Sequence, residues 1–579
     1  MKQTPKTLNP ALKPVFRPIM KGIMSLSLAA SLLLSACAVQ QGETDVDAEK
    51  NVATVEEAEA KKDVGALKRE MHPGAPPQAM PAMRQQAQAP VGYVSDDRPN
   101  DGQNQVQHNT EDYSRIYENP FLEVSKNPLS TFSIDVDTAS YSNMRRFIES
   151  RQLPPADAVR IEELVNYFPY SYPLPSGEHP FSVTADLAEC PWARNHKLVR
   201  IGLRGQPVSL RQLPPQNLVF LLDVSGSMNS PNKLPLLKRS LKLLVDQMRE
   251  QDHVSIVVYA GAAGLVLPPT NGARRENILA ALNQLEAGGS TAGSAGIQLA
   301  YETAKKHFRK DGNNRVILAT DGDFNVGPSS EGELVRMIED RRKEGIFLTV
   351  LGYGMGNYKD SRMEQLADKG NGNYAYIDNL SEARKVLVSE LGGTLQTIAK
   401  DVKLQLEFNP AKVASYRLIG YENRLLRNED FEDDSKDAGE LGAGTTVTAL
   451  YEIAPASGAG SAQDLRYQQQ TVKPEALNSD ELMSIKLRYK PPTAEASKLL
   501  AQVLKDQPKA WSAVPADFRF AAAVAGFGMQ LRKSEHRGNW QMEDVIAQAK
   551  AGVGDDQEGY RKSFVTLAQL ASELIQKQN

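Results

Sequence analysis

Oxygen-bearing side chains recur at three points of the chain that adjoin predicted turns. Asp223, Ser225 and Ser227 follow an apolar run with the spacing D-x-S-x-S, Thr291 lies just after a Gly-Gly pair, and Asp321 ends a second apolar run. Mg²⁺ and Mn²⁺ prefer oxygen ligands, and Mg²⁺ keeps several waters, so one or two carboxylates suffice to hold it. These five residues predict a divalent cation site. Because most of the ligands are neutral, the ion would remain electrophilic and could accept a carboxylate from a partner.

The composition argues against several other kinds of site. The chain of 579 residues contains seven His and two Cys, which leaves little for a zinc cluster. Its formal net charge of −4 provides no basic field for nucleic acid. The sequence has no phosphate-binding G-x-x-x-x-G-K-[ST] loop, and its His residues lie far from any nucleophile signal. We therefore expect a protein that is not an enzyme.

The elements that must position these residues alternate between strand and helix. Continuous apolar strands separated by amphipathic helices are typical of a parallel sheet covered on both faces, the doubly wound (Rossmann-like) α/β fold. In such a sheet, ligands bind outside the carboxyl ends of the strands, where Asp223 and Asp321 would stand. We expect the surrounding loops to be 228–233, 261–272 and 324–329. The pattern predicts strands over 217–223, 253–260, 314–320, 345–353 and 373–377, and helices near 235–250, 273–286, 294–309, 330–344, 360–369 and 380–399.

The five residues, in this order and on these elements, resemble the metal-ion-dependent adhesion site (MIDAS) of von Willebrand factor type A (VWA) domains. The resemblance spans about 217–399. It implies Mg²⁺ or Mn²⁺ as the cofactor and a protein ligand whose exposed acidic residue completes the metal's coordination. The metal ligands that it implies are Asp223, Ser225, Ser227, Thr291 and Asp321.

The N-terminal segment has the pattern of a targeting signal. Residues 1–21 carry Lys and Arg but no acid, and residues 22–36 are uncharged, mostly apolar and too short to span a membrane. The small residues before Cys37 resemble the lipobox of bacterial lipoproteins, which implies cleavage before Cys37 and lipidation of it. Ala38 then favours the outer membrane of a Gram-negative bacterium. The chain as a whole resembles a bacterial VWA domain-containing lipoprotein with flanking family regions.

The remaining chain divides by composition. After the signal peptide (1–36) we expect a disordered Pro/Gln/Ala-rich linker (37–111), because few apolar residues recur there. A flanking region of helices and strands (112–212) precedes the VWA domain (213–399), and a β-rich and then helical region (400–579) follows it.

The flanking segments carry their own periodicity. Strands predicted at 181–187 and 197–203 have no sheet of their own nearby, so we expect them to pair with the period-two strands after residue 400. Helices are predicted over 155–168, 517–534 and 563–577. We expect Asp135 and Asp137 to cap the helix that follows them, the acidic segment 429–440 to be a solvated loop, and Cys190 to be a small core or near-surface residue.

Three functions are compatible with this pattern. The first is a lipid-anchored cell-envelope binding protein that captures a protein ligand through a metal ion. The second is a metal-dependent hydrolase, for which Asp323 is the one additional candidate base near the site. The third is a structural envelope lipoprotein in which the metal only stabilises the domain. We favour the first, with contacts to a membrane through the lipid anchor and none to nucleic acid.

Overall fold

The computed structural model describes residues 110–135, 137–290, 293–322, 324, 331–456 and 472–578. The predicted signal peptide, almost the whole predicted linker, Cys37 and Thr291 lie outside these residues. Within the described ranges, no helix combines the length and the apolar character that crossing a membrane requires.

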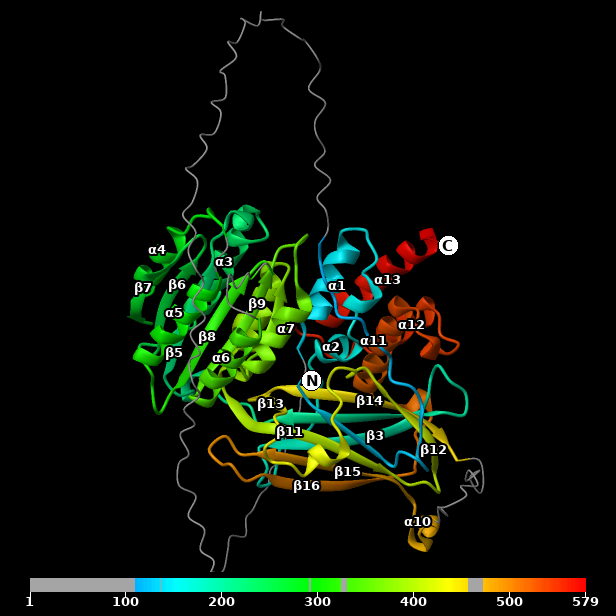
Figure 1. The fold of residues 1–579 in the computed structure, drawn as a ribbon. Helices are drawn as coiled ribbons and strands as arrows, with labels where there is room; N and C mark the ends of the chain where they lie inside the picture. The colour runs from blue at the N-terminus through cyan, green and yellow to red at the C-terminus, as the bar shows by residue number, and fades with distance from the viewer. Residues whose placement is uncertain are drawn as a thin grey trace, which may run out of the picture. The chain divides into compact units, whose positions relative to one another are not determined.

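A six-stranded sheet forms the centre of the α/β domain (Figure 1). Its order is β10-β9-β8-β5-β6-β7, and every pair is parallel except β6 with β7. Every residue of β5 and β8 is buried, as expected for strands covered on both faces. The strands are β5 (Gln216–Asp223), β6 (His253–Tyr259), β7 (Ala263–Asn271), β8 (Asn313–Thr320), β9 (Ile346–Tyr353) and β10 (Tyr374–Ile377).

Helices cover both faces of this sheet, which confirms the doubly wound prediction. Alternate residues of β5 point into two separate hydrophobic clusters, one with Phe220 and one with Leu221. The first cluster includes α3 (Leu234–Val245), α4 (Arg275–Asn283), α8 (Leu380–Arg384), the π-helical turn η4 (Lys385–Ser389) and α9 (Leu391–Leu395). The second includes α5 (Gly293–Lys306), α6 (Glu331–Lys343) and α7 (Asp360–Lys369).

The flanking segments form two further sheets around one core. Ile201 of β4 lies opposite Ala449 of β14, so strands from before and after the α/β domain pair as predicted. Apolar residues of both sheets belong to a single buried cluster. One sheet has the order β1 (Leu122–Glu123), β12 (Val413–Ile419), β14 (Thr446–Pro455), β4 (Lys197–Gly205) and β3 (Phe181–Glu189). The other has β13 (Gly439–Gly442), β11 (Thr397–Phe408), β15 (Glu481–Lys490) and β16 (Lys498–Lys505), with β2 (Leu129–Ser133) also on β11.

A helical layer joins the two ends of the described chain. The N-terminal helices α1 and α2 share a hydrophobic cluster with the C-terminal helices α11, α12 and α13, and they lie side by side in Figure 1. Cys190 is buried in the same cluster. The helices are α1 (Ala139–Glu149), α2 (Ile161–Asn166), α11 (Ala516–Arg532), α12 (Met542–Ala551) and α13 (Tyr560–Gln578), with the short α10 (Pro474–Asn478) apart from them.

Several local predictions differ from the structure. The expected loop 261–272 contains the edge strand β7, and the expected helix 155–168 is a short 3₁₀ turn at Ala156–Ala158 followed by α2. The expected helix 380–399 is broken into α8, η4 and α9, and β11 begins at Thr397. Asp137 does not cap α1, since the N-cap residue Thr138 has no side-chain capping bond.

Candidate functional site

The predicted metal ligands come from the carboxyl ends of adjacent strands. Asp223 is the last residue of β5, and Asp321 follows Thr320 at the end of β8. Because β5 and β8 are neighbouring parallel strands, their ends meet at one edge of the sheet. The structure therefore brings four of the five predicted residues, Asp223, Ser225, Ser227 and Asp321, to this edge, and Asp223, Ser225 and Asp321 are 0%, 2% and 0% exposed.

Both oxygens of the Asp223 carboxylate accept hydrogen bonds. The backbone N–H of Ser225 donates to its Oδ1 (2.9 Å). The hydroxyls of Tyr259 and Thr320 donate to its Oδ2 (3.1 and 3.3 Å). Burial raises the pKa of Asp223 to about 6, against the lowering effect of its bonds to Ser225. The carboxylate is therefore fixed in orientation, and a cation beside it would favour its charged form.

The two serine hydroxyls have the separation that a small divalent ion needs. The hydroxyls of Ser225 and Ser227 are hydrogen-bonded to each other, with their Oγ atoms 3.0 Å apart. Octahedral Mg²⁺ binds oxygen at about 2.0–2.1 Å, so two adjacent ligands lie about 3.0 Å from each other. The donor set of hydroxyls and carboxylates fits this ion. Among the described residues, no group of three or more His, Cys, Asp and Glu side chains could hold a metal.

The glycine-rich segment runs against the serine turn. The N–H of Gly226 donates to the carbonyl of Gly289 (3.0 Å), and the N–H of Gly288 donates to the carbonyl of Val224 (2.8 Å). These bonds hold the segment before Thr291 beside the turn. Thr291 itself lies outside the described residues, as does Asp323.

Lys233 is a charged neighbour of the site that the sequence analysis did not single out. Its ammonium group donates to Oδ2 of Asp321 (2.8 Å), and its side chain is 9% exposed. Lys233 precedes α3 directly. A lysine before a helix has no distinctive spacing relative to Asp321, 88 residues later, so only the folded chain reveals the pair.

The first described residues pack against the loop that follows β9. The N–H groups of Thr110 and Asp112 donate to the carbonyls of Gly356 and Tyr358 (2.8 and 3.0 Å). The Glu111 carboxylate accepts a hydrogen bond from the N–H of Gly356 (2.8 Å) and two from the Arg146 guanidinium (2.9 Å each). We call Thr110–Asp112 the N-terminal strap. It includes the last two residues of the range that was predicted to be a linker.

The loop under the strap is also in contact with the metal-site turn. A Cβ atom on Gly322 would lie 2.7 Å from the N atom of Lys359 and 2.8 Å from Cα of Tyr358. The φ of Gly322 is +99°, which L side chains rarely adopt. The turn after Asp321 therefore requires glycine, and the loop 354–359 forms its wall.

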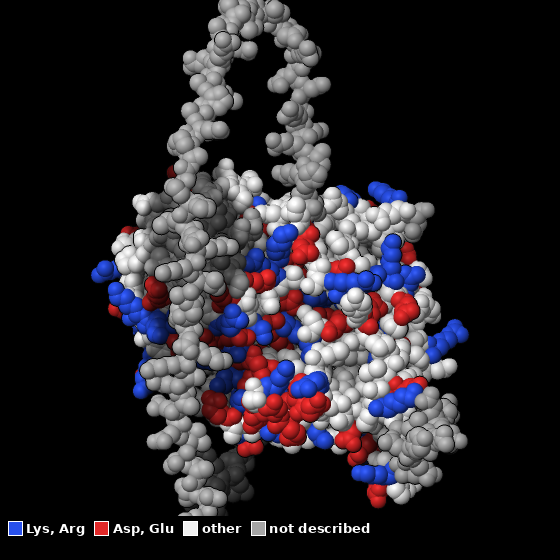
Figure 2. Space-filling view, in the orientation of Figure 1, with Lys and Arg blue, Asp and Glu red and all other residues white. Residues whose placement is uncertain are grey.

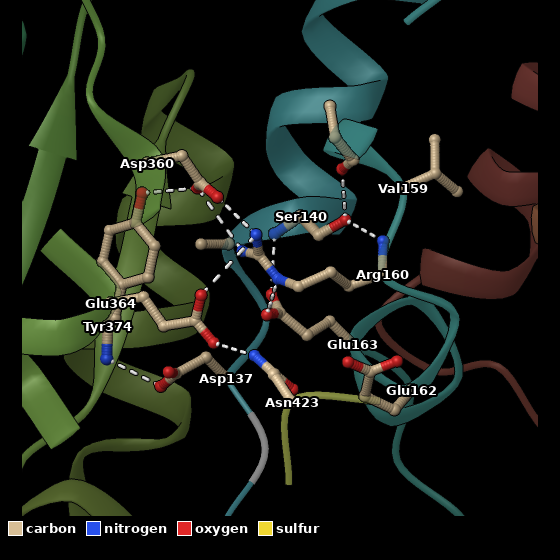
Figure 3. Close-up of polar contacts among 12 residues, drawn as sticks. Asp137, Ser140, Val159, Arg160, Glu162, Glu163, Asp360, Glu364, Tyr374 and Asn423 are labelled. Carbon is tan, nitrogen blue, oxygen red and sulfur yellow. Dashed lines mark hydrogen bonds and ion pairs between the residues drawn. The ribbon is translucent and has the colours of Figure 1, made fainter. Parts of the chain in front are cut away.

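A second buried polar cluster joins the α/β domain to its neighbours (Figure 3). Arg160 pairs with Glu163 of α2 and with Asp360 of α7. The hydroxyl of Tyr374 also donates to Asp360 (2.9 Å). Burial raises the pKa of Glu162 to about 7, and the charge of Glu422 adds to this effect.

Arg424 completes this cluster from the β-rich domain. Its guanidinium lies 2.5 Å from Asp368, 3.1 Å from Glu364 and 3.2 Å from Asp135. Asp137 is also within 3.6 Å of it and accepts a bond from the N–H of Tyr374 (2.8 Å). Asp135 and Asp137 thus hold three parts of the fold together, which explains why they are not helix caps.

The acidic segment 429–440 lies over β11 and β15, where Figure 2 shows acidic side chains gathered. Arg488 of β15 pairs with Glu432 (2.6 Å) and Asp434 (3.1 Å). A hydrogen bond from Ser497 and the Arg488 guanidinium lower the pKa of Asp434 to about 2. Two acids of the segment are therefore paired with a strand of the sheet beside it.

Comparison with known proteins identifies the family. Family models match at residues 107–200 (von Willebrand factor), 217–389 (von Willebrand factor type A domain) and 393–574 (Uncharacterized protein YfbK, C-terminal). The chain is 44% identical over 466 residues to the uncharacterized protein YfbK of Escherichia coli K12, covering 79% of this chain and 80% of YfbK. The protein belongs to the YfbK family of VWA domain-containing proteins. The fold prediction of a VWA domain is thereby confirmed.

Other relatives and solved structures match smaller parts of this YfbK-family protein. It is 29% identical to protein sll0103 of Synechocystis over 31% of this chain and 45% of that one. It is 26% identical to human inter-alpha-trypsin inhibitor heavy chain H3 over 37% and 23%. A von Willebrand factor type A structure from Catenulispora acidiphila covers 68% of this chain and 87% of its own, with 15% identity and a TM-score of 0.35. A structure of the mussel byssus protein PTMP1 with a zinc-occupied MIDAS motif matches 31% of this chain and 45% of its own, with 22% identity and a TM-score of 0.25.

Proposed function

We propose that this protein is a lipid-anchored binding protein of the cell envelope. Its VWA domain would hold Mg²⁺ or Mn²⁺ at a MIDAS-type site and capture a protein ligand through an acidic side chain of that ligand. The observation that carries the proposal is the 3.0 Å separation of the Ser225 and Ser227 hydroxyl oxygens beside the fixed Asp223 carboxylate. Two hydroxyls at this spacing form one edge of an octahedral Mg²⁺ shell.

Each residue has a distinct part in this proposal. Ser225 and Ser227 would supply neutral ligands, Asp223 and Asp321 the negative charge, directly or through water, and Thr291 a third hydroxyl. When bound, the ion supplies a Lewis-acidic position for a carboxylate oxygen. The protein's own contribution is to hold Asp223 with three hydrogen bonds, so that the ligand oxygens are in place before the ion arrives.

The hydrolase alternative has less support. A hydrolase requires a general base beside the metal-bound water. Asp223 already accepts three hydrogen bonds and Asp321 is paired with Lys233, so neither of these two is placed as a free base. Asp323, the candidate base from the sequence, lies outside the described residues. In the third alternative, the metal ion only stabilises the domain. That alternative differs from the binding function because no protein ligand completes the site.

Calorimetric titration of Mn²⁺ and Mg²⁺ into the full-length chain tests the metal site. We expect one saturable site in the wild type and none in Asp223→Ala or Ser225→Ala, each of which retains the wild-type circular dichroism spectrum. Binding that survives both substitutions would refute the proposed ligands.

Capture of envelope proteins by the immobilised chain separates the remaining alternatives. We expect at least one partner that is released by EDTA, recovered on adding Mn²⁺ and absent with Asp223→Ala. Metal binding with no such partner would favour the structural alternative, and metal-dependent turnover of phosphoester or peptide substrates would favour the hydrolase.

The anchor and location are proposed from Cys37 and the residues before it. We expect the wild type to incorporate a fatty acid and to fractionate with outer membranes. A Cys37→Ala chain should do neither. An unlabelled wild-type chain in the soluble fraction would refute the anchor.

A further inference from the structure

A lysine ammonium lies beside one of the carboxylates of the proposed metal site. The Lys233 ammonium lies 2.8 Å from Oδ2 of Asp321, where the side chains of the two residues are 9% and 0% exposed. Both charges are thus largely shielded from water. Electrostatic interactions are stronger at such a buried position than at the protein surface. Asp321 is one of the two carboxylates on which the proposed metal site depends.

The position of Lys233 is built into the fold. A Cβ atom on Gly354 would lie 2.3 Å from Cε and 2.7 Å from Cγ of Lys233, so the lysine stem fills the space that a side chain at position 354 would need. Gly354 has a φ of +79°, and its carbonyl accepts a hydrogen bond from the hydroxyl of Tyr376 (2.5 Å). The lysine stem therefore packs directly against the Gly354 backbone, which the hydrogen bond from Tyr376 holds in place.

We propose that Lys233 is an internal counter-ion that competes with the divalent cation for Asp321. This inference rests on the proposed metal site and adds its regulation. Without metal, the ammonium neutralises one of the two buried carboxylates. A divalent ion that uses Asp321 must displace the ammonium or bind against its charge, and either effect weakens metal binding.

The competition gives the proposed partner a defined role. At this buried site, the charges of two carboxylates, one lysine and one divalent ion add up to +1. A carboxylate from a partner would neutralise it. The lysine thereby makes the site favour metal and acidic ligand together over metal alone.

Titration of Mn²⁺ into full-length wild type, Lys233→Met and Lys233→Arg tests this inference. We expect Lys233→Met to bind Mn²⁺ at least tenfold more tightly than wild type, because it keeps the stem and removes the charge. Lys233→Arg should bind no more tightly than wild type. The matched control is Lys242→Met, which makes the same charge change at an exposed position of the same helix and should leave the affinity unaltered.

A second measurement needs no variant. If Mn²⁺ displaces the ammonium, acylation of Lys233 by an amine-reactive reagent, quantified by mass spectrometry, should increase at least severalfold when Mn²⁺ replaces EDTA. Acylation of Lys242 should not change. This arm tests displacement of the ammonium directly and does not require Lys233→Met to fold.

The outcomes separate this inference from the proposed function. Wild type that binds Mn²⁺, with equal or weaker binding by folded Lys233→Met and unchanged acylation, overturns the inference alone. Absence of binding by every chain overturns the proposed metal site and the inference together. Binding by Lys233→Met where wild type binds none supports the inference most directly.

Discussion

Replacing Glu162 with Gln should change the pH dependence of stability in a defined direction. Glu162 is 3% exposed on α2, and its Oε2 atom has no hydrogen-bond partner in the described part of the chain. Its pKa is about 7, against an ordinary value of 4.5. Between these two pH values, the folded protein keeps a proton on Glu162 that the unfolded chain has lost. Stability therefore falls as the pH rises from about 4.5 to about 7 and stays lower above that.

The size of the effect follows from the shift. About 2.5 pKa units at 1.36 kcal/mol each correspond to about 3 kcal/mol. Gln resembles the protonated carboxyl group and does not titrate. The free energy of unfolding of Glu162→Gln should therefore exceed that of wild type by about 3 kcal/mol more at pH 8 than at pH 4.

Guanidinium denaturation of both full-length chains at several pH values between about 4 and 8 measures this difference. Glu149→Gln is the control, because Glu149 lies exposed on α1 and should change stability by less than about 0.5 kcal/mol at every pH. A Glu162→Gln effect that is constant across this range would refute the reasoning, because it would show that Glu162 titrates alike in both states.

Three further predictions concern the same structure. Arg424→Met leaves four carboxylates without their shared cation and should lower the free energy of unfolding by about 3–5 kcal/mol in denaturant titrations; a loss below about 1 kcal/mol would mean that the ion pairs are dispensable. In thermal melts, Gly322→Ala should lower the free energy of unfolding by about 1–3 kcal/mol because of the positive φ and the contact with Lys359. Gly177→Ala is the control and should not change it, since nothing lies within 4 Å of the Cβ position of Gly177. Mg²⁺ at 100 times its Kd should stabilise wild type by about 2.7 kcal/mol and Ser225→Ala not at all; equal stabilisation of both would place the ion elsewhere.

The parts of the fold that could be predicted are those that depend on the local spacing of apolar and polar residues. Strands β5 and β8 are buried on both faces, so their continuous apolar runs indicate a parallel sheet directly. The D-x-S-x-S spacing places Ser225 and Ser227 on one turn, and the structure has their hydroxyls adjacent. The assignment of these residues as metal ligands remains a prediction.

Other features depend on pairings between distant residues. β7 contains Pro268 and Pro269, which argue against a strand in the middle of a sheet but are tolerated at an edge. The break after α8 places Lys385 on a π-helical turn, where its ammonium pairs with Glu390. Nothing in the local sequence indicates either outcome. The same holds for Lys233 with Asp321, since a charged residue alone does not specify its partner.

The N-terminal strap has a mechanical consequence. Thr110 and Asp112 bond to the loop 354–359, and that loop is packed against both Gly322 and the Lys233 stem. If residue 37 is attached to a membrane, a force between the membrane and a ligand in the crevice would pass from the strap into this loop and then into the site. The loop that receives this force would thus also be the wall of the proposed metal site, so tension on the tether would reach Gly322, next to Asp321, and the Lys233 stem.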